Sequence, residues 1–219
     1  MTTTTRRLVA TAAAAACLFG LGTGVASAQL PDFGSSGGVP TTSETDPVVL
    51  VDSFGGIGKG RLVKQIMSSP AVSQGGTIKF RVMVQYVAGS NTRVELVRDA
   101  VPAALQLVKV ERPVDGALGT SMKTIEANAY EQTTYNGIDY TTVSWKEGGF
   151  LGMFQDNPEI TPGHPVFVDF TYKVPADMAT GEHKHGAEAR INTLINPEVK
   201  NGTGAQPFTV SEATRPFGS

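Results

Sequence analysis

The residues whose types and spacing best suit chemistry are two histidines, His183 and His185. On a β-strand, side chains two positions apart share a face, so two imidazoles there are placed to hold a metal ion. Glu182 and Glu188 lie close by in the sequence. A metal ion usually needs three or four convergent ligands, and the third histidine, His164, lies elsewhere. The pattern therefore favours the solvated start of a strand, and we predict no metal and no cofactor.

Nucleophilic catalysis needs a nucleophile activated by a neighbouring base and an orienting acid. No serine has a local context that marks it as activated, and the one cysteine, Cys17, lies in the apolar N-terminal segment. The glycine-rich segment 55–60 follows an apolar strand, as a phosphate cradle would, but it lacks the Gly-Lys-Ser/Thr ending. We therefore predict a hairpin loop at 55–60 and no enzyme activity. An enzyme whose site assembles from scattered residues stays open as a third hypothesis.

Aromatic residues concentrate between positions 135 and 154 and are the strongest candidates for a binding surface. They are Tyr135, Tyr140, Trp145, Phe150 and Phe154. Trp145 closes an alternating segment and is expected to be buried. The run 150–154 reads Phe-Leu-Gly-Met-Phe in a predicted loop, and an exposed apolar loop often marks a contact surface. We predict a binding site for a glycan, peptide or lipid at Trp145, Phe150, Leu151 and Phe154.

The elements that position these residues are β-strands, because the apolar period along the chain is two. In 77–86 the residues at 78, 80, 82, 84 and 86 are apolar or aromatic, and Lys79, Arg81 and Gln85 alternate with them. The segment 166–174 repeats the pattern, with polar residues at 169, 171 and 173. Such alternation is typical of a sheet with one buried face and does not fit a helix.

Shorter runs complete the set of predicted strands. They are 48–54, 61–67, 92–97, 105–111, 140–145, 187–194 and 207–210. Turn-forming residues such as Gln74-Gly75-Gly76 and Asn136-Gly137 separate them, and 176–185 is the one candidate for a short helical turn. We predict an all-β fold, an antiparallel β-sandwich of about eight to ten short strands.

The N-terminus has the layout of a secretory signal peptide. Arg6 and Arg7 precede an uncharged, mostly apolar run, 8–25, which is followed by Ala26-Ser27-Ala28. Cleavage is expected between Ala28 and Gln29. The alternative is a membrane anchor, and the run is near the lower length limit for crossing a bilayer. The paired arginines leave both the general and the twin-arginine export routes open.

The predicted signal peptide implies a secreted or cell-envelope location, and the chain behind it divides into further segments. We predict a signal peptide over 1–28, a flexible linker over 29–47, a single β-domain over 48–210 and a loose tail over 211–219. The cleaved segment holds the only cysteine, so a disulfide framework is excluded. The net charge is −2, with both signs interspersed, so we expect no nucleic-acid partner. No later segment is apolar enough for a transmembrane span in the mature chain.

Three motifs in order resemble the conserved repeat domain of bacterial cell-surface and secreted proteins. The first runs over 64–70 and 72–80, where a lysine-bearing strand leads through a proline and a glycine turn to a long alternating strand. The second is 99–105, an acidic residue followed by proline and leucine, and the third is Ile-Thr-Pro-Gly at 160–163. The resemblance covers about 61–195. It implies an immunoglobulin-like fold, a place in the envelope or outside the cell, and no assigned activity.

The chain departs from that family at 185–189, where the family has an asparagine followed by alternating small and apolar residues. The aromatic insert 130–157 is also longer than the family's.

Some immunoglobulin-like surface domains carry an amide bond between a lysine and an asparagine beside a buried acid. Lys64, Asn192 and either Glu95 or Asp99 are the residues of this chain that could supply one. We expect instead that Lys64 faces outward on an alternating strand.

These observations lead to two principal hypotheses about function. The first is a secreted or envelope-associated, non-catalytic protein that acts through surface binding or a structural or adhesive role, on an unknown envelope or extracellular component. The alternative is a small-molecule or lipid carrier with an apolar entrance at 149–154. An enclosed apolar pocket near Trp145 would favour the carrier, whereas a filled core would favour the surface module.

Overall fold

The computed structural model describes residues 44–90, 92–116, 119–145, 157–192 and 198–213. These residues form fifteen β-strands in three sheets and one 3-10 turn at Ala127–Ala129. The predicted signal peptide, with its Ala28–Gln29 cleavage site, lies outside them, as do most of the predicted linker and the end of the predicted tail. Among the described residues, no helix is long and apolar enough to cross a membrane.

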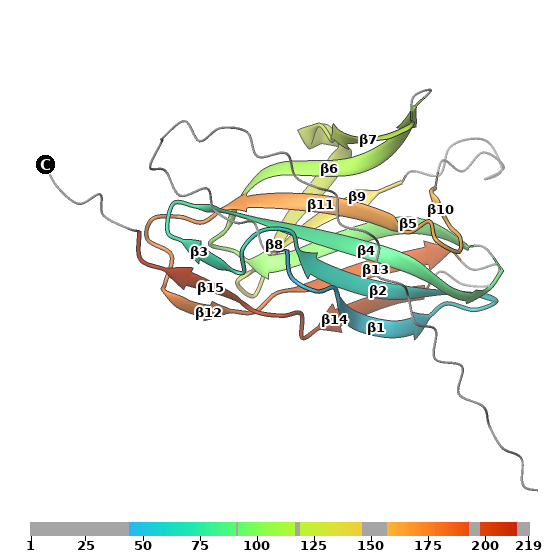
Figure 1. The fold of residues 1–219 in the computed structure, drawn as a ribbon, viewed down its shortest axis with the longest axis horizontal. Coiled ribbons are helices and arrows are strands. Elements are labelled where there is room, and N and C mark those ends of the chain that lie inside the picture. The colour runs from blue at the N-terminus through green and yellow to red at the C-terminus, as the bar shows by residue number, and fades with distance from the viewer. Residues whose placement is uncertain (1–43, 91, 117–118, 146–156, 193–197, 214–219) are drawn as a thin grey trace, which may run out of the picture. The chain divides into compact units, whose positions relative to one another are not determined.

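The first sheet contains six antiparallel strands in the order β1-β2-β4-β11-β6-β7 (Figure 1). They are β1 (Val48–Phe54), β2 (Gly58–Ile66), β4 (Thr77–Gly89), β11 (Val166–Lys173), β6 (Gln106–Gly116) and β7 (Gly119–Thr124). The central pair, β4 and β11, aligns without interruption from Thr77 opposite Lys173 to Val84 opposite Val166. This register places the apolar residues of both strands on the same face of the sheet.

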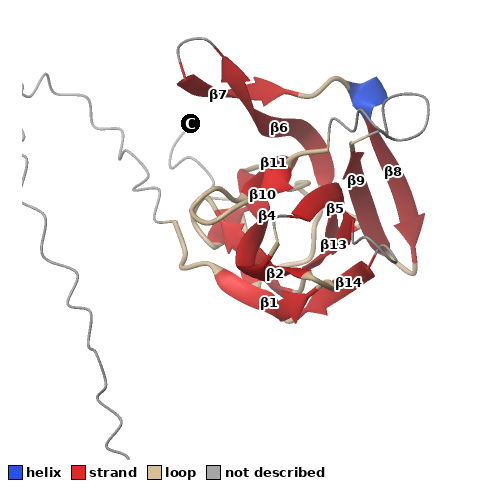
Figure 2. Ribbon diagram, turned by 90° about the vertical axis from the view of Figure 1, so that its right-hand side faces the viewer, coloured by secondary structure: helices blue, strands red, loops and turns tan. Residues whose placement is uncertain are grey.

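The second sheet has the order β14-β13-β5-β9-β8, and β10 also pairs with β5. Its strands are β14 (Glu198–Thr203), β13 (Gly186–Asn192), β5 (Thr92–Pro102), β9 (Ile138–Ser144), β8 (Tyr130–Tyr135) and β10 (Glu159–Ile160). A small third sheet joins β12 (Gly181–His183), β15 (Phe208–Ser211) and β3 (Ala71–Ser73). Figure 2 shows the 3-10 turn that connects β7 of the first sheet to β8 of the second.

The apolar faces of the two large sheets form one hydrophobic core. Buried side chains from both sheets contribute to it, among them Ile78, Phe80, Val82, Val84, Phe170, Val94, Val97, Val143, Ala189 and Ile191. Each buried Val, Ile or Phe among them stabilises the fold by about 1.5–3 kcal/mol. The third sheet adds Val72, Phe208 and Val210 to the same core. The all-β, antiparallel sandwich class predicted from the alternation is confirmed.

The turn between β8 and β9 follows from two residue types. Asn136 and Gly137 have φ angles of 50° and 75°. Positive φ at both central positions defines the type I′ turn, whose twist matches that of the strands it joins, and Asn-Gly is its preferred sequence. The turn pairs Tyr135 with Ile138 and thereby fixes the register of the hairpin.

The structure corrects the predicted number of strands. The described residues contain fifteen strands, whereas about eight to ten were predicted. The prediction was too low because several short strands lack the alternating signal. β7 is exposed along its whole length and β8 along nearly all of it, so neither needs an apolar face. The pairing of β15 with β3 is parallel, which departs from a purely antiparallel fold.

One local prediction was wrong, and another was right in kind but too long. The segment 176–185 forms no helical turn and instead contains β12, because its residues pair with β15. Part of the predicted loop 55–60 belongs to a strand, since β2 already begins at Gly58 and pairs with Gly89 of β4. A Cβ atom built on Gly89 would come within 1.8 Å of the Ile57 carbonyl oxygen, so this close pairing depends on a glycine.

Candidate functional site: a surface groove and a buried lysine–aspartate pair

A surface groove of about 400 Å³ lies beside Trp145 and is partly open to solvent. Polar and apolar atoms line it in similar amounts. The lining residues are Arg112, Pro113, Thr120, Trp145, Pro158, Glu159, Gly163, His164, Pro165, Val166 and Phe167. They come from β6, β7, the residue after β9, and the segment leading through β10 into β11.

The chain holds Trp145 firmly at the groove. Trp145 follows β9 directly, and its backbone N–H donates to the carbonyl of Glu95 at 2.9 Å. Its half-buried side chain packs against the hydrophobic core. One part of the ring is therefore anchored and another part contributes to the groove.

A tight turn also lines the groove. Thr161 and His164 exchange backbone hydrogen bonds of 3.4 and 3.0 Å around Gly163, whose φ is 79°. Phe167 follows on β11, and the guanidinium carbon of Arg81 lies 4.1 Å from the centroid of its ring. The groove thus combines fixed aromatic surfaces with hydrogen-bonding groups, an arrangement suited to binding a partly polar ligand.

Of the four predicted binding residues, the structure places one in the groove. Trp145 lines the groove, and its side chain is half-buried, whereas a buried side chain was expected. Phe150, Leu151 and Phe154 lie outside the described residues. Tyr135 is 68% exposed and lies at the turn of the β8–β9 hairpin, whereas Trp145 follows the other end of β9. The structure therefore does not bring these two aromatic residues together.

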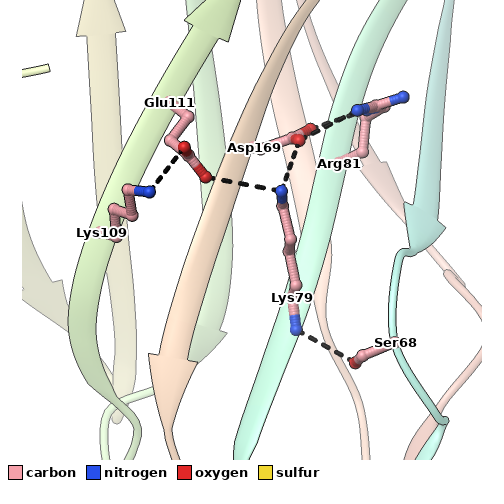
Figure 3. Close-up of polar contacts among 6 residues, drawn as sticks. All are labelled: Ser68, Lys79, Arg81, Lys109, Glu111 and Asp169. Atoms are coloured by element: carbon pink, nitrogen blue, oxygen red, sulfur yellow. Dashed lines mark hydrogen bonds and ion pairs between the residues drawn. The ribbon is translucent and has the colours of Figure 1, made fainter. Parts of the chain in front are cut away.

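A network of charged side chains covers the outer face of the first sheet (Figure 3). Arg81 donates two hydrogen bonds to Asp169, at 2.6 and 2.9 Å, and Lys79 Nζ lies 2.9 Å from Asp169 Oδ2. Lys79 also lies 3.5 Å from Glu111, which Lys109 contacts at 2.7 Å. The hydrogen bond from Lys109 lowers the pKa of Glu111, with further lowering from the nearby charges. Each charged side chain of this network has a partner of opposite charge within it.

The second candidate site is inside the core, where Lys64 of β2 meets Asp99 of β5. Both side chains are 0% exposed, and Lys64 Nζ lies 2.5 Å from Asp99 Oδ1. The same Nζ donates to the carbonyls of Gly186 at 2.7 Å and Ala100 at 3.5 Å. Burial lowers the pKa of Lys64, although the charge of Asp99 opposes that change. The expectation that Lys64 faces outward was wrong.

A hydroxyl pair completes the environment of Asp99. The hydroxyl of Tyr172, on β11, donates to Asp99 Oδ2 at 2.9 Å and lies 3.3 Å from Thr141 Oγ1. Burial, together with the nearby Asp99 carboxylate, raises the pKa of Tyr172 well above its ordinary value. The phenol therefore keeps its proton and remains a hydrogen-bond donor to the carboxylate.

His185 lies beside this buried pair. Its ring centroid is 4.6 Å from that of Phe80, whose own ring lies 4.5 Å from Lys64 Nζ. Burial, and then the charge of Lys64, lower the pKa of His185 to about 2. The ring is thus neutral, and its Nε2 donates to the Gln206 carbonyl at 2.6 Å, which assigns the proton to that nitrogen.

The structure does not combine the two neighbouring histidines into a metal site. His183 stacks on Phe208 and its Nε2 lies 2.8 Å from the Ala179 carbonyl, whereas His185 is in the core. Within the described parts of the chain, no three His, Cys, Asp or Glu residues come close enough to hold a metal ion.

The other residues considered for an internal cross-link are placed elsewhere. Asn192 pairs with Arg93 at one end of β13, six residues from Gly186, so its backbone is about 20 Å from the carbonyl that Lys64 contacts. Glu95 pairs with Arg190. Of the candidate acids, only Asp99 therefore meets Lys64.

The sequence contained a signal for the buried position of Lys64, but none for the contacts that its neighbours make with Asp99. Lys64 is in phase with Leu62 and Ile66, both of which are buried, so the period of two itself indicates an inward side chain. The charge of lysine argued for the opposite orientation. The alternation over 166–174 also placed Tyr172 inward, but the proximity of Tyr172 and Thr141 to Asp99 had no signal, because it arises from the pairing and stacking of strands distant in sequence.

Comparisons with known proteins yield similarities of structure only. No family model matches the chain, and no curated protein matches it in sequence. Among solved structures, the fold is similar to AvmM, which catalyses macrocyclization in alchivemycin A biosynthesis, at 13% identity over 78% of this chain and 100% of that one, with a TM-score of 0.41.

Two bacterial surface proteins are also similar in structure, at similarly low sequence identity. The major pilin SpaD of Corynebacterium diphtheriae matches at 14% identity and a TM-score of 0.42, over 65% of this chain and 34% of SpaD. The C-terminal domain of the antigen I/II-family protein AspA of Streptococcus pyogenes matches at 12% identity and a TM-score of 0.34, over 70% of this chain and 54% of that domain. The chain thus spans about a third of the length of SpaD and half that of the AspA domain, and it resembles such β-sandwich domains at low identity.

Proposed function

We propose that this protein is an exported, envelope-associated β-sandwich that acts by non-catalytic surface contact, with the groove beside Trp145 as its contact site. The observation that carries the proposal is the composition of that groove. A fixed tryptophan and Phe167 lie beside cationic and hydrogen-bonding groups in a recess that is partly open to solvent. The signal-peptide layout of residues 1–28 supports the location.

The groove best fits a segment of an extracellular glycan or a glycan-bearing polymer. Aromatic faces such as that of Trp145 supply flat contact area at little cost in conformational entropy. Arg112, His164 and Glu159 offer hydrogen-bonding groups of both kinds within the same recess. An open recess also allows a long chain to pass through without burying its ends.

The same geometry favours surface contact over the carrier hypothesis. A carrier for lipids or small apolar molecules needs an enclosed, mainly apolar cavity. The space beside Trp145 is open and mixed in polarity, and side chains from both large sheets fill the described core.

The sole tryptophan of the chain provides a direct test, because its fluorescence reports on the groove alone. We expect the purified protein to co-sediment with insoluble cell-wall glycan, and soluble fragments of that glycan to change the emission of Trp145 in a saturable way. Trp145→Ala and, separately, Arg112→Ala are expected to reduce co-sedimentation at least several-fold. Tyr135→Ala serves as the matched control, because it removes an exposed aromatic residue from β8, away from the groove.

Two results would contradict the proposal. One is equal co-sedimentation of the native protein and both groove variants. The other is an unchanged Trp145 emission at glycan concentrations that saturate sedimentation, since binding would then occur elsewhere. Circular dichroism of each variant establishes that it has kept its β-structure.

A further inference from the structure

We propose that Lys64 and Asp99 are joined by an intramolecular amide bond that forms in the folded chain with release of one water molecule. The bond links β2 of the first sheet to β5 of the second, and so connects the two sheets covalently through the core. In a chain whose only cysteine lies at position 17, it would supply the covalent link that a disulfide supplies elsewhere.

The contact between the two side chains is short and, unlike the equally short Arg190–Glu95 pair, completely buried. Lys64 Nζ lies 2.5 Å from Asp99 Oδ1, and both side chains are 0% exposed. Among the described residues, Asp99 Oδ1 nevertheless has no partner aligned for a hydrogen bond. A contact of that length brings Nζ near the separation of about 3–3.5 Å from the carboxyl carbon at which bond formation starts.

The reaction balances without any other reagent. A proton passes from the Lys64 ammonium to the Asp99 carboxylate, which gives a neutral amine and a neutral acid. The amine nitrogen then attacks the carboxyl carbon, and the C–N bond forms as one C–O bond breaks. The departing hydroxyl takes one proton from the nitrogen and leaves as water, so no oxidant, reductant or cofactor is consumed.

The surroundings favour both the neutral reactants and the product. Burial lowers the pKa of Lys64, which makes the nucleophilic free amine more accessible. The Tyr172 hydroxyl donates to Asp99 Oδ2 at 2.9 Å and can stabilise the negative charge that develops on that oxygen during attack. The amide removes both charges from a site where each ion has lost its hydration.

The positions of the backbone acceptors also suit the product. The carbonyls of Gly186 and Ala100 lie 2.7 and 3.5 Å from Lys64 Nζ. The amide keeps one N–H, which the nearer carbonyl can accept.

Mass spectrometry of the native chain tests the proposal without a variant. Once the N-terminus is known, the intact mass is expected to lie about 18 Da, one water, below that of the sequence. Trypsin does not cleave after an acylated lysine, so the digest should contain segment 62–79 joined to segment 99–109. An unmodified intact mass, or the separate linear peptides 62–64, 65–79 and 99–109, would overturn the proposal.

A matched pair of variants assigns the bond. Lys64→Met removes the amine, and its mass is expected to show no deficit. Lys79→Met makes the same change at a lysine whose Nζ lies 2.9 Å from Asp169 on the outer face, and its deficit is expected to remain. Loss of the deficit in Lys79→Met alone, or a deficit of about 17 Da corresponding to ammonia, would refute the assignment to Lys64 and Asp99.

Discussion

Tyr172 of β11 donates a hydrogen bond of 2.9 Å to Asp99 of β5, and so links the two large sheets through the hydrophobic core. Asp99 is in turn the partner of Lys64 from β2. Three strands from the two sheets thus converge on one buried carboxylate.

Replacing Tyr172 by phenylalanine tests the hydroxyl alone. Tyr172→Phe keeps the packing of the ring but leaves Asp99 Oδ2 without its donor. Since an unsatisfied buried acceptor costs about 1–3 kcal/mol, we expect the free energy of unfolding to fall by that amount. Urea titration measures it, with Tyr135→Phe at an exposed position as the control. Equal stability of Tyr172→Phe and the native protein would show that the hydrogen bond contributes nothing.

The Lys64–Asp99 pair should behave as a unit on mutation. Lys64→Met leaves a buried acid without its partner, and we expect a loss of about 3–5 kcal/mol. The double change Lys64→Met with Asp99→Leu removes both polar groups, so it should be more stable than the single variant. Chemical denaturation of the native protein, both single variants and the double variant gives the interaction free energy between the two residues. Additive losses would contradict a direct interaction.

His185 should make the fold sensitive to acid. Its pKa is near 6.5 when unfolded and about 2 in the folded chain. Above pH 6.5 both states are neutral and stability is unaffected. As the pH falls below 6.5, the unfolded state gains a proton that the folded state excludes, and stability declines by about 1.4 kcal/mol per pH unit.

Urea unfolding at about pH 7 and pH 5 measures this effect. We expect the native protein to lose about 2 kcal/mol more than His185→Gln between those values. His183→Gln makes the same chemical change outside the core and should retain the native dependence. An identical pH dependence in native protein and His185→Gln would be incompatible with a neutral buried imidazole.

Glu111 should stabilise the fold over a different range of pH. Its lowered pKa means that the folded state favours the carboxylate, so the stabilisation is present above the ordinary value of 4.5 and is lost as the pH falls through the lower folded value. Glu111→Gln is therefore expected to cost about 1 kcal/mol at neutral pH and progressively less in acid. Unfolding measured across pH 7 to about 3, with Glu131→Gln on exposed β8 as the control, tests this. A constant difference would contradict the assignment.

The amino-acid sequence by itself determined the strand class and the main strands of the core. Alternation with a period of two is a local property, because successive side chains of a strand point to opposite faces. It therefore located β4 and β11 and identified Phe80 and Phe170 as inward-facing. The Asn136-Gly137 turn was equally local.

Short polar strands gave no such signal. The exposed β7 has no buried face, so its place depends on hydrogen bonding to β6 and not on the pattern of its side chains. The parallel pairing of β3 with β15 joins two segments that lie far apart in the sequence, so neither segment alone predicts it.

Only the tertiary structure decided where the polar groups meet. Asp99 and Tyr172 are 73 positions apart, and Lys64 and Gly186 are 122 apart, so each contact depends on the order of strands and the stacking of two sheets. Lys64 was expected to face outward, and the structure places it in the core. A partner offsets much of the cost of burying a charge, and here that partner comes from another strand.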